Sequence, residues 1–257
     1  MFVVVSKKKV IYSILSLALV VALLVSVSAG GFASVYFGSA SRLIPIYAVE
    51  TEKPEVAITF DAAYGSDKTE GIMEIMKEYG AEGTFFLVGF WVENFPEKTK
   101  AIAENGFEIG THSNTHPHMS RLSESQINQE LTISMNIIEE TAGVRPTIFR
   151  APFGEYNDKV ISEASKLKLS TIQWDVDSLD WKNVTTEDIT NRVLSRVKNG
   201  SIILFHNNSD HILDALPIVL STLKERGYTF KKVSDIIHTE NYYIDNNGVQ
   251  HEQVKNG

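Results

Sequence analysis

The order of apolar and amphipathic segments restricts this chain to one class of fold. Between residues 54 and 238, short segments rich in β-branched and aromatic residues alternate with stretches of helical spacing. We expect strands at 56–60, 84–88, 108–110, 147–150, 169–174 and 202–205. Strands that alternate with helices form a parallel sheet. With six or seven such repeats in about 190 residues, the sequence favours an α/β fold with a closed or nearly closed barrel over an open doubly wound sheet.

Residues at the predicted helix ends support this alternation. Ser123 with Gln126, and Thr185 with Asp188, have the spacing of a capping box, in which two side chains satisfy free N–H groups at the start of a helix. Glycines follow the helical stretches where a left-handed residue would end each helix: Gly80, Gly106, Gly143, Gly200 and Gly227. The sequence has no glycine-rich phosphate-binding motif, so it gives no indication of nucleotide binding.

The N-terminal region differs in composition from the rest of the chain. A basic flank, residues 1–9, ends in three lysines, and residues 10–37 are nearly uncharged. Their most apolar part, residues 10–27, is long enough to span or nearly span a hydrocarbon core about 30 Å thick. This length exceeds the ~7–15 residues typical of a cleaved signal peptide. We therefore favour an uncleaved membrane anchor over a cleaved signal, and either alternative places the remaining chain outside the cytoplasm.

The rest of the chain divides into a linker at 38–53, one folded domain at 54–238 and a polar tail at 239–257. A hydrophobic content of 43% is sufficient for the core of one such domain. The net charge of −8 argues against a nucleic-acid partner, which requires a basic surface. Because cysteine is absent, any metal ion must be held by nitrogen and oxygen ligands. The sequence does not indicate the oligomeric state.

Polar residues close several of the apolar segments. Asp61, Arg150 and His206 each end a predicted strand. Because the carboxyl ends of parallel strands meet at one face of an α/β scaffold, we expect these side chains to share one site. A carboxylate at the end of a buried strand is costly without a partner, and Arg150 is the natural cation to keep Asp61 ionised. A purely structural ion pair is the alternative.

Two histidines follow the segment at 107–110. His112 and His116 are four residues apart, so a short turn or loop would direct both imidazoles at one point, as a first-row metal ion requires. Taken alone, such a pair fits a surface or capping role equally well. His206 belongs to the same set, because a nearby carboxylate such as Asp180 would raise its pKa into the range of a proton donor.

Five motifs occur in a fixed order in this chain: Thr59-Phe60-Asp61, His112-Ser113-Asn114-Thr115-His116, Arg150-Ala151-Pro152-Phe153-Gly154, Asp177-Ser178-Leu179-Asp180-Trp181 and Leu204-Phe205-His206. Together they resemble the five motifs of the polysaccharide deacetylases, carbohydrate esterase family 4, over residues 54–237. The resemblance implies a distorted (β/α) barrel with about seven repeats. It also implies hydrolysis of N-acetyl groups on the amino sugars of a polysaccharide, with peptidoglycan of the cell wall or spore cortex expected ahead of chitin.

The resemblance also implies roles for four catalytic residues. Asp61 resembles the general base, and Arg150 the residue that orients this base. His206 resembles the general acid, and Asp180 the carboxylate that tunes its pKa.

Five further residues resemble the metal and substrate sites of the family. His112 and His116 resemble ligands of a divalent metal ion, with zinc expected ahead of cobalt, nickel or manganese. Phe153 and its N–H group resemble the border of the oxyanion site. Trp181 and Leu204 resemble the walls of the pocket that takes the acetyl methyl group.

One position departs from the family pattern. Members usually carry a second aspartate directly after the base, which completes an Asp-His-His metal site, whereas Ala62 follows Asp61 here. We expect Ala62 to occupy the place of this ligand and the metal to bind more weakly than usual, because catalytic zinc normally has three protein ligands. Asp67 would substitute only if its loop folds back. The variant resembles the membrane-anchored, sporulation-associated branch of the family.

Two other classes of function remain open. One is a polysaccharide-binding protein that kept the barrel and lost catalysis with the missing aspartate. The joint presence of Asp61, Arg150, Asp180 and His206 counts against it, because an inactive site does not require them together. The other is a glycosidase that uses paired carboxylates such as Asp177 and Asp180, for which the two histidines would be unnecessary.

Overall fold

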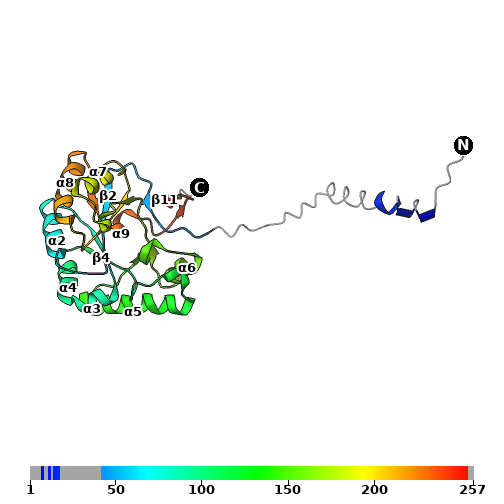
Figure 1. The fold of residues 1–257 in the computed structure, drawn as a ribbon, viewed down its shortest axis with the longest axis horizontal. Coiled ribbons are helices and arrows are strands. Elements are labelled where there is room, and N and C mark those ends of the chain that lie inside the picture. Colours follow the sequence, from blue (N-terminus) through cyan, green and yellow to red (C-terminus); the bar gives the residue numbers. More distant parts are fainter. Residues whose placement is uncertain (1–6, 9–10, 13, 18–41, 254–257) are drawn as a thin grey trace. The chain divides into compact units, whose positions relative to one another are not determined.

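The computed structural model describes residues 7–8, 11–12, 14–17 and 42–253 in two separate units (Figure 1). In the first unit, residues 1–42, the described residues between 7 and 17 are helical. Most of the predicted anchor or signal segment, 10–37, lies outside the described residues. Among the residues that are described, no helix is long and apolar enough to cross a membrane.

The second unit, residues 43–257, is built around a parallel sheet of eight strands. Seven of them follow the order β6-β5-β4-β3-β2-β8-β7, and β9 pairs with β2. Their bounds are β2 (Glu55–Ala62), β3 (Thr84–Leu87), β4 (Glu108–Thr111), β5 (Ile148–Phe149), β6 (Ser170–Thr171), β7 (Val176–Asp177), β8 (Ile202–His206) and β9 (Thr229–Lys231). In the described part of the chain no pairing joins β6 to β7, so the curled sheet is an incompletely closed barrel. The predicted α/β class and distorted barrel are confirmed.

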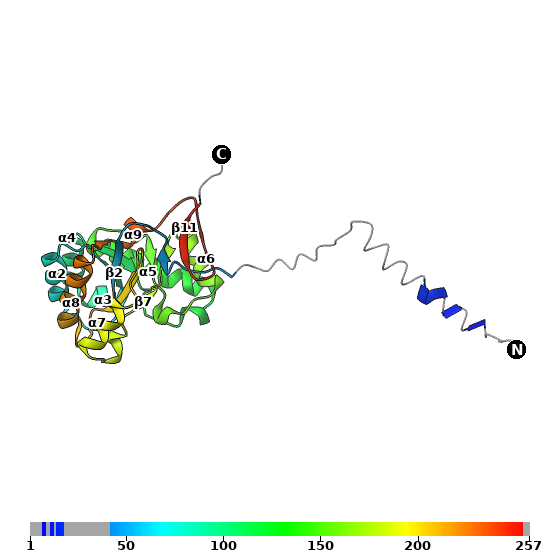
Figure 2. The same ribbon diagram turned by 90° about the horizontal axis from the view of Figure 1, so that it is seen from above.

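Helices surround this sheet in both views (Figures 1 and 2). They are α2 (Thr69–Glu78), α3 (Gly89–Asn94), α4 (Pro96–Glu104), α5 (Glu124–Ala142), α6 (Asp158–Lys166), α7 (Thr186–Leu194), α8 (Ile212–Glu225) and α9 (Val233–Ile236). Both predicted capping boxes are present: Ser123 with Gln126 begins α5, and Thr185 with Asp188 begins α7. Gly143 ends α5 in the left-handed region, with φ of 70°.

The central strand β2 separates two apolar cores. Its side chains alternate between the two faces of the sheet, as in any strand. Phe60 and Ala62 belong to the core between sheet and helices, together with Ile58 and Val56. Ala57 belongs to the core on the inner face. Thr59 and Asp61 share the parity of Ala57, so the strand directs them to the inner face as well.

The ends of this unit differ from the sequence expectation. Within the predicted linker, β1 (Ala48–Val49) pairs with β11 (Val249–Glu252), which pairs in turn with β10 (Tyr242–Ile244) in the predicted polar tail. These strands were missed because they are short and, in β10 and much of β11, only partly buried, which gives no clear hydrophobic alternation. The folded unit therefore extends beyond the predicted boundaries at 54 and 238.

Candidate functional site

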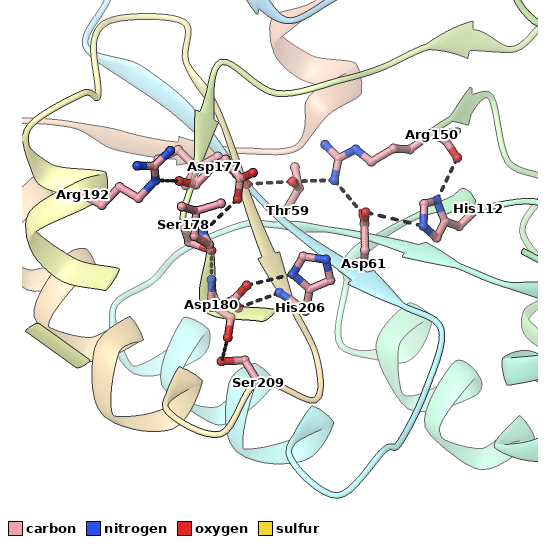
Figure 3. A network of polar contacts seen from close by, with 12 residues as sticks. Thr59, Asp61, His112, Arg150, Asp177, Ser178, Asp180, Arg192, His206 and Ser209 are labelled. Atoms are coloured by element: carbon pink, nitrogen blue, oxygen red, sulfur yellow. Dashed lines mark hydrogen bonds and ion pairs between the residues drawn. The ribbon is translucent and has the colours of Figure 1, made fainter. Parts of the chain in front are cut away.

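The predicted polar residues lie together at the carboxyl ends of the strands (Figure 3). Asp61 is next to last in β2 and pairs in register with His206, the last residue of β8. His112 and Arg150 directly follow β4 and β5. The parallel order of these strands therefore brings together residues that are up to 145 positions apart.

Asp61 and Arg150 form a buried ion pair. Nη1 of Arg150 donates to Asp61 Oδ1 at 2.8 Å and to Thr59 Oγ1 at 2.9 Å, and Nη2 donates to the Gln173 carbonyl at 3.0 Å. The guanidinium carbon lies 4.1 Å from the centre of the Phe86 ring. Arg150 is completely buried and absent from the lining of the pocket, so it supports the site from behind.

This environment favours the ionised form of Asp61. Burial raises the pKa of the Asp61 carboxyl group. The charge of Arg150 and its hydrogen bond, together with the charges of His112 and His206, outweigh burial and bring the pKa below its usual value. Asp61 is therefore a carboxylate at neutral pH, and it can accept a proton from a neighbouring group that becomes acidic, such as an activated water.

His112 has a defined tautomer. Its Nδ1 lies 2.8 Å from the Arg150 carbonyl oxygen, which can only accept, so Nδ1 carries the proton and Nε2 has a free lone pair. Nε2 lies 3.5 Å from Asp61 Oδ2. The ring of His116 lies 5.0 Å from that of His112, centre to centre. Burial lowers the pKa of both imidazoles, and with the added effect of neighbouring His112 it lowers the pKa of His116 to about 4.

These two neutral imidazoles suit a divalent metal ion, but they do not form a complete three-ligand site. In the part of the chain that the structure describes, no group of three His, Cys, Asp or Glu residues is arranged to hold a metal ion. Asp67 is exposed and does not line the pocket. The donor set fits a two-nitrogen site whose remaining positions are open to water or substrate.

The position expected for the missing ligand requires a correction. Ala62 is completely buried and packs in the core between sheet and helices, and it does not line the pocket. The physical reason is strand alternation: Asp61 faces the inner side, so the next residue faces the helices. The following residue, Ala63, lines the pocket. The expectation that the Ala62 side chain points toward a metal ion is therefore wrong.

His206 and Asp180 form a second polar pair. Nδ1 of His206 lies 2.8 Å from Asp180 Oδ1, and the His206 backbone N–H donates to Asp180 Oδ2 at 2.9 Å. Burial lowers the pKa of His206, whereas the hydrogen bond and charge of Asp180, and the charges of Asp61 and Asp177, raise it. The net pKa lies above the usual value, as expected of a proton donor.

A pocket of about 500 Å³ opens onto these groups. It is lined by Asp61, Ala63, Tyr64, His112, His116, Phe153, Trp174, Asp177, Trp181, Leu204, His206 and Asn208. All three residues predicted to bind substrate, Phe153, Trp181 and Leu204, are in this lining, and their roles stay predictions. Asp180 is 2% exposed and holds His206 from outside the pocket, so Asp177 and Asp180 do not form the paired carboxylates of a glycosidase.

Sequence reasoning missed four pocket residues: Ala63, Tyr64, Trp174 and Asn208. Tyr64 is 61% exposed, and its ring centre lies 6.2 Å from that of His116 and 5.7 Å from that of Phe90. Its place three residues after Asp61 was the available signal, because the loop that follows a catalytic strand borders the same site. The other three residues fall outside the motifs or gave no chemical signal.

Comparison with known proteins agrees with this geometry. The sequence model of the polysaccharide deacetylase family matches residues 48–172. A peptidoglycan-N-acetylglucosamine deacetylase of Bacillus cereus is 34% identical over 73% of this chain and 70% of its own length. The uncharacterized protein YlxY of Bacillus subtilis is 35% identical over 75% of this chain, and the matched region spans 60% of YlxY.

A solved structure adds a relative with altered activity. A mutant of BA3943, a carbohydrate esterase family 4 pseudoenzyme, has restored enzymatic activity, and the wild-type protein comes from Bacillus anthracis. The mutant is 33% identical to this chain and superposes on it with a TM-score of 0.73. The superposed region is 75% of this chain and 70% of the mutant chain. Members with and without activity therefore share this scaffold.

Proposed function

The chain belongs to the polysaccharide deacetylase family, and we propose that it hydrolyses N-acetyl groups of amino sugars in peptidoglycan. The single observation that carries this proposal is the arrangement of a base and an acid on one pocket. Asp61 is held ionised by Arg150, and His206 is held protonated over a wider pH range by Asp180. Amide hydrolysis requires this pair of functions. Peptidoglycan is proposed as the polymer because the Bacillus cereus relative is named for it.

The residues of this chain divide the reaction into two proton transfers. Asp61 removes a proton from the attacking water, and the positive charge of Arg150 keeps the carboxylate available. His206 then protonates the departing sugar amine, because an amide nitrogen is a poor leaving group without that proton. Loss of the acid is expected to cost about 10²–10⁴ in rate.

We further propose that a divalent metal ion, zinc first, is held by His112 and His116 and completed by water or substrate. When bound, such an ion polarises the acetyl carbonyl and lowers the pKa of its water. Phe153, Trp181 and Leu204 border the space for the acetyl group. The exposed rings of Tyr64, Phe153 and Trp181 around the pocket support binding of a sugar chain.

The proposal includes a place of action. Peptidoglycan lies outside the cytoplasm, and the apolar segment at 10–37 is the feature of the sequence that would carry the domain there, as an anchor or as a cleaved signal. The membrane, through this segment, is thus a proposed partner, and use of the enzyme in sporulation is part of the same proposal. Detection of the protein in a washed membrane fraction supports the anchor, and recovery of a shortened protein in the medium supports the signal.

A second candidate is a polysaccharide-binding protein without catalytic activity. Two observations favour it: the described residues contain no three-ligand metal group, and BA3943 is a pseudoenzyme on the same scaffold. The decisive experiment measures acetate release from peptidoglycan and from chitin oligomers, with and without added zinc or cobalt. Metal-stimulated release supports the deacetylase. Binding to either polymer without acetate release under all conditions supports the inactive protein.

His112→Ala and His116→Ala are expected to lower zinc content and acetate release together, because each removes one of the two nitrogen ligands. Zinc affinity is measured by titration and activity by acetate release. His211→Ala, which removes a histidine outside the pocket, is the matched control and should leave both values unchanged. Full activity in both pocket variants, in the presence of a chelator, would contradict the metal site.

Asp180→Asn is expected to move the alkaline limb of the pH profile of kcat/KM to lower pH. His206 acts while protonated, so activity falls as pH rises through its pKa, and Asp180 is the main cause that raises this pKa. Removing the charge lowers the pKa, and the decline therefore begins at lower pH. The same profile measured for Asp210→Asn, an exposed aspartate, serves as control. An alkaline limb that does not move in Asp180→Asn would exclude His206 as the acid.

A further inference from the structure

The loop that carries the two histidines has an unfavourable backbone conformation. Two of its residues, Ser113 with φ of 69° and His116 with φ of 57°, lie in the left-handed region without being glycine. A Cβ atom disfavours this region, so the surrounding structure must hold the loop in place. Without such support, the relative placement of the His112 and His116 rings would not be fixed.

Glu130, on helix α5, provides support from one side. Its Oε2 accepts hydrogen bonds from the backbone N–H groups of Asn114 at 2.9 Å and Thr115 at 2.8 Å. Its Oε1 accepts from the Thr115 hydroxyl group at 2.7 Å. Three donors of one loop thus converge on one carboxylate, and hydrogen bonds to an ionised acceptor are the strong ones.

Helix α3 also holds the loop, through backbone hydrogen bonds. The backbone N–H groups of Gly89 and Phe90 donate to the carbonyls of Ser113 at 2.9 Å and Asn114 at 3.1 Å. A Cβ atom on Gly89 would lie 2.2 Å from Asn114 Oδ1 and 3.1 Å from Asn114 Cα, so helix α3 and the loop are closely packed at this point. Within the loop, Ser113 Oγ accepts from the His116 N–H at 3.0 Å. Displacement of Ser113 would therefore also displace the acceptor of the His116 N–H.

We infer that Glu130 is a positioning residue for the metal site: it fixes the loop so that His112 and His116 present their rings to one point. Glu130 does not line the pocket, so it acts through the loop and not on the substrate. The inference rests on the proposed deacetylase function for its biological meaning. Its physical content, a loop held by one carboxylate, can be measured without any substrate.

The test compares Glu130→Ala, Glu130→Gln and a matched control, Glu139→Ala. Glu139 lies on the same helix, and its carboxylate forms an ion pair with Arg145. Amide hydrogen exchange reports on the N–H groups of Asn114 and Thr115, and zinc titration reports on the ligand geometry. In Glu130→Ala we expect exchange at these amides to accelerate at least about tenfold and zinc affinity to fall about 10–100-fold, the range typical of residues that orient metal ligands. Glu130→Gln keeps an oxygen acceptor and should recover most of both values.

The melting temperature of each variant shows whether a loss of zinc affinity comes from misplaced histidine rings or from a general loss of stability. Glu139→Ala is expected to leave amide exchange in the loop and zinc affinity at the parent values. Should Glu130→Ala fail to fold, Thr115→Val removes only the hydroxyl contact to Glu130 and should lower zinc affinity by a smaller factor at an unchanged melting temperature. Zinc affinity equal to the parent in the folded Glu130 or Thr115 variants overturns the inference. A protein that binds zinc through this loop but releases no acetate would instead contradict the proposed function and leave the inference standing.

Discussion

Asp61→Asn is expected to abolish acetate release, with a loss of at least about 10²–10⁴-fold in kcat, because an amide cannot take the proton of the attacking water. The substitution keeps an oxygen that can accept from Arg150, and Arg150 retains its bonds to Thr59 and to the Gln173 carbonyl. The protein should therefore fold, with a lower melting temperature because the buried guanidinium loses its counter-charge.

The control for this variant is Asp175→Asn. Asp175 is also largely buried, and its carboxylate accepts from the Ser201 hydroxyl and the Ile202 N–H at 2.9 Å each, outside the pocket. Its loss should reduce stability and leave acetate release per folded molecule near the parent value. Parent-like activity in Asp61→Asn, measured on protein shown by circular dichroism to be folded, would remove Asp61 from the mechanism.

Ala62→Asp is expected to destabilise the fold by about 3–5 kcal/mol, because it places a carboxylate without a partner in an apolar core. The Ala62 side chain is completely buried among apolar residues between sheet and helices. For a unit of this size the melting temperature should fall by roughly 10 °C or more. Zinc affinity should not rise, in contrast to what the motif alone indicates.

Ala63→Asp is the matched comparison, because Ala63 lies one residue further along and lines the pocket. A carboxylate at this position would be partly exposed and would line the same pocket as the two imidazoles, so it should raise zinc affinity by at least about tenfold with little loss of stability. Thermal melting and zinc titration of the two variants give opposite patterns. Tighter zinc binding in Ala62→Asp at an unchanged melting temperature would show that the end of β2 has a different orientation.

The regular part of this fold could be predicted because its signals are local. Strands such as β2 and β8 are continuous apolar runs, and the capping boxes of α5 and α7 fix helix starts within the sequence itself. Strands β5, β6 and β7 have two residues each, and their pairing depends on neighbours far along the chain. Local composition therefore gave the approximate place of β5 and β6 but not their extent, and β7 was not predicted.

The candidate site also has one part that local sequence signals predict and one part that depends on the three-dimensional structure. Residue types at strand ends identified Asp61, His112, Arg150 and His206, because charged and imidazole groups at such positions need a partner. The side of the sheet to which each residue points was not accessible to motif matching, and this led to the error at Ala62. Strand parity, counted from Asp61, would have assigned Ala62 to the outer face.

Substitution of Arg150 would affect Asp61 and His112 differently. The Arg150 side chain sets the charge state of Asp61, whereas its main-chain carbonyl sets the proton position on His112. Every amino acid supplies that carbonyl, but only arginine supplies this fork of donors. A lineage that loses Arg150 would therefore lose the cation that keeps the proposed base ionised, while His112 keeps the tautomer that the proposed metal site requires. Reversion of one codon would then restore turnover, so inactivity in such a protein need not be an evolutionary dead end.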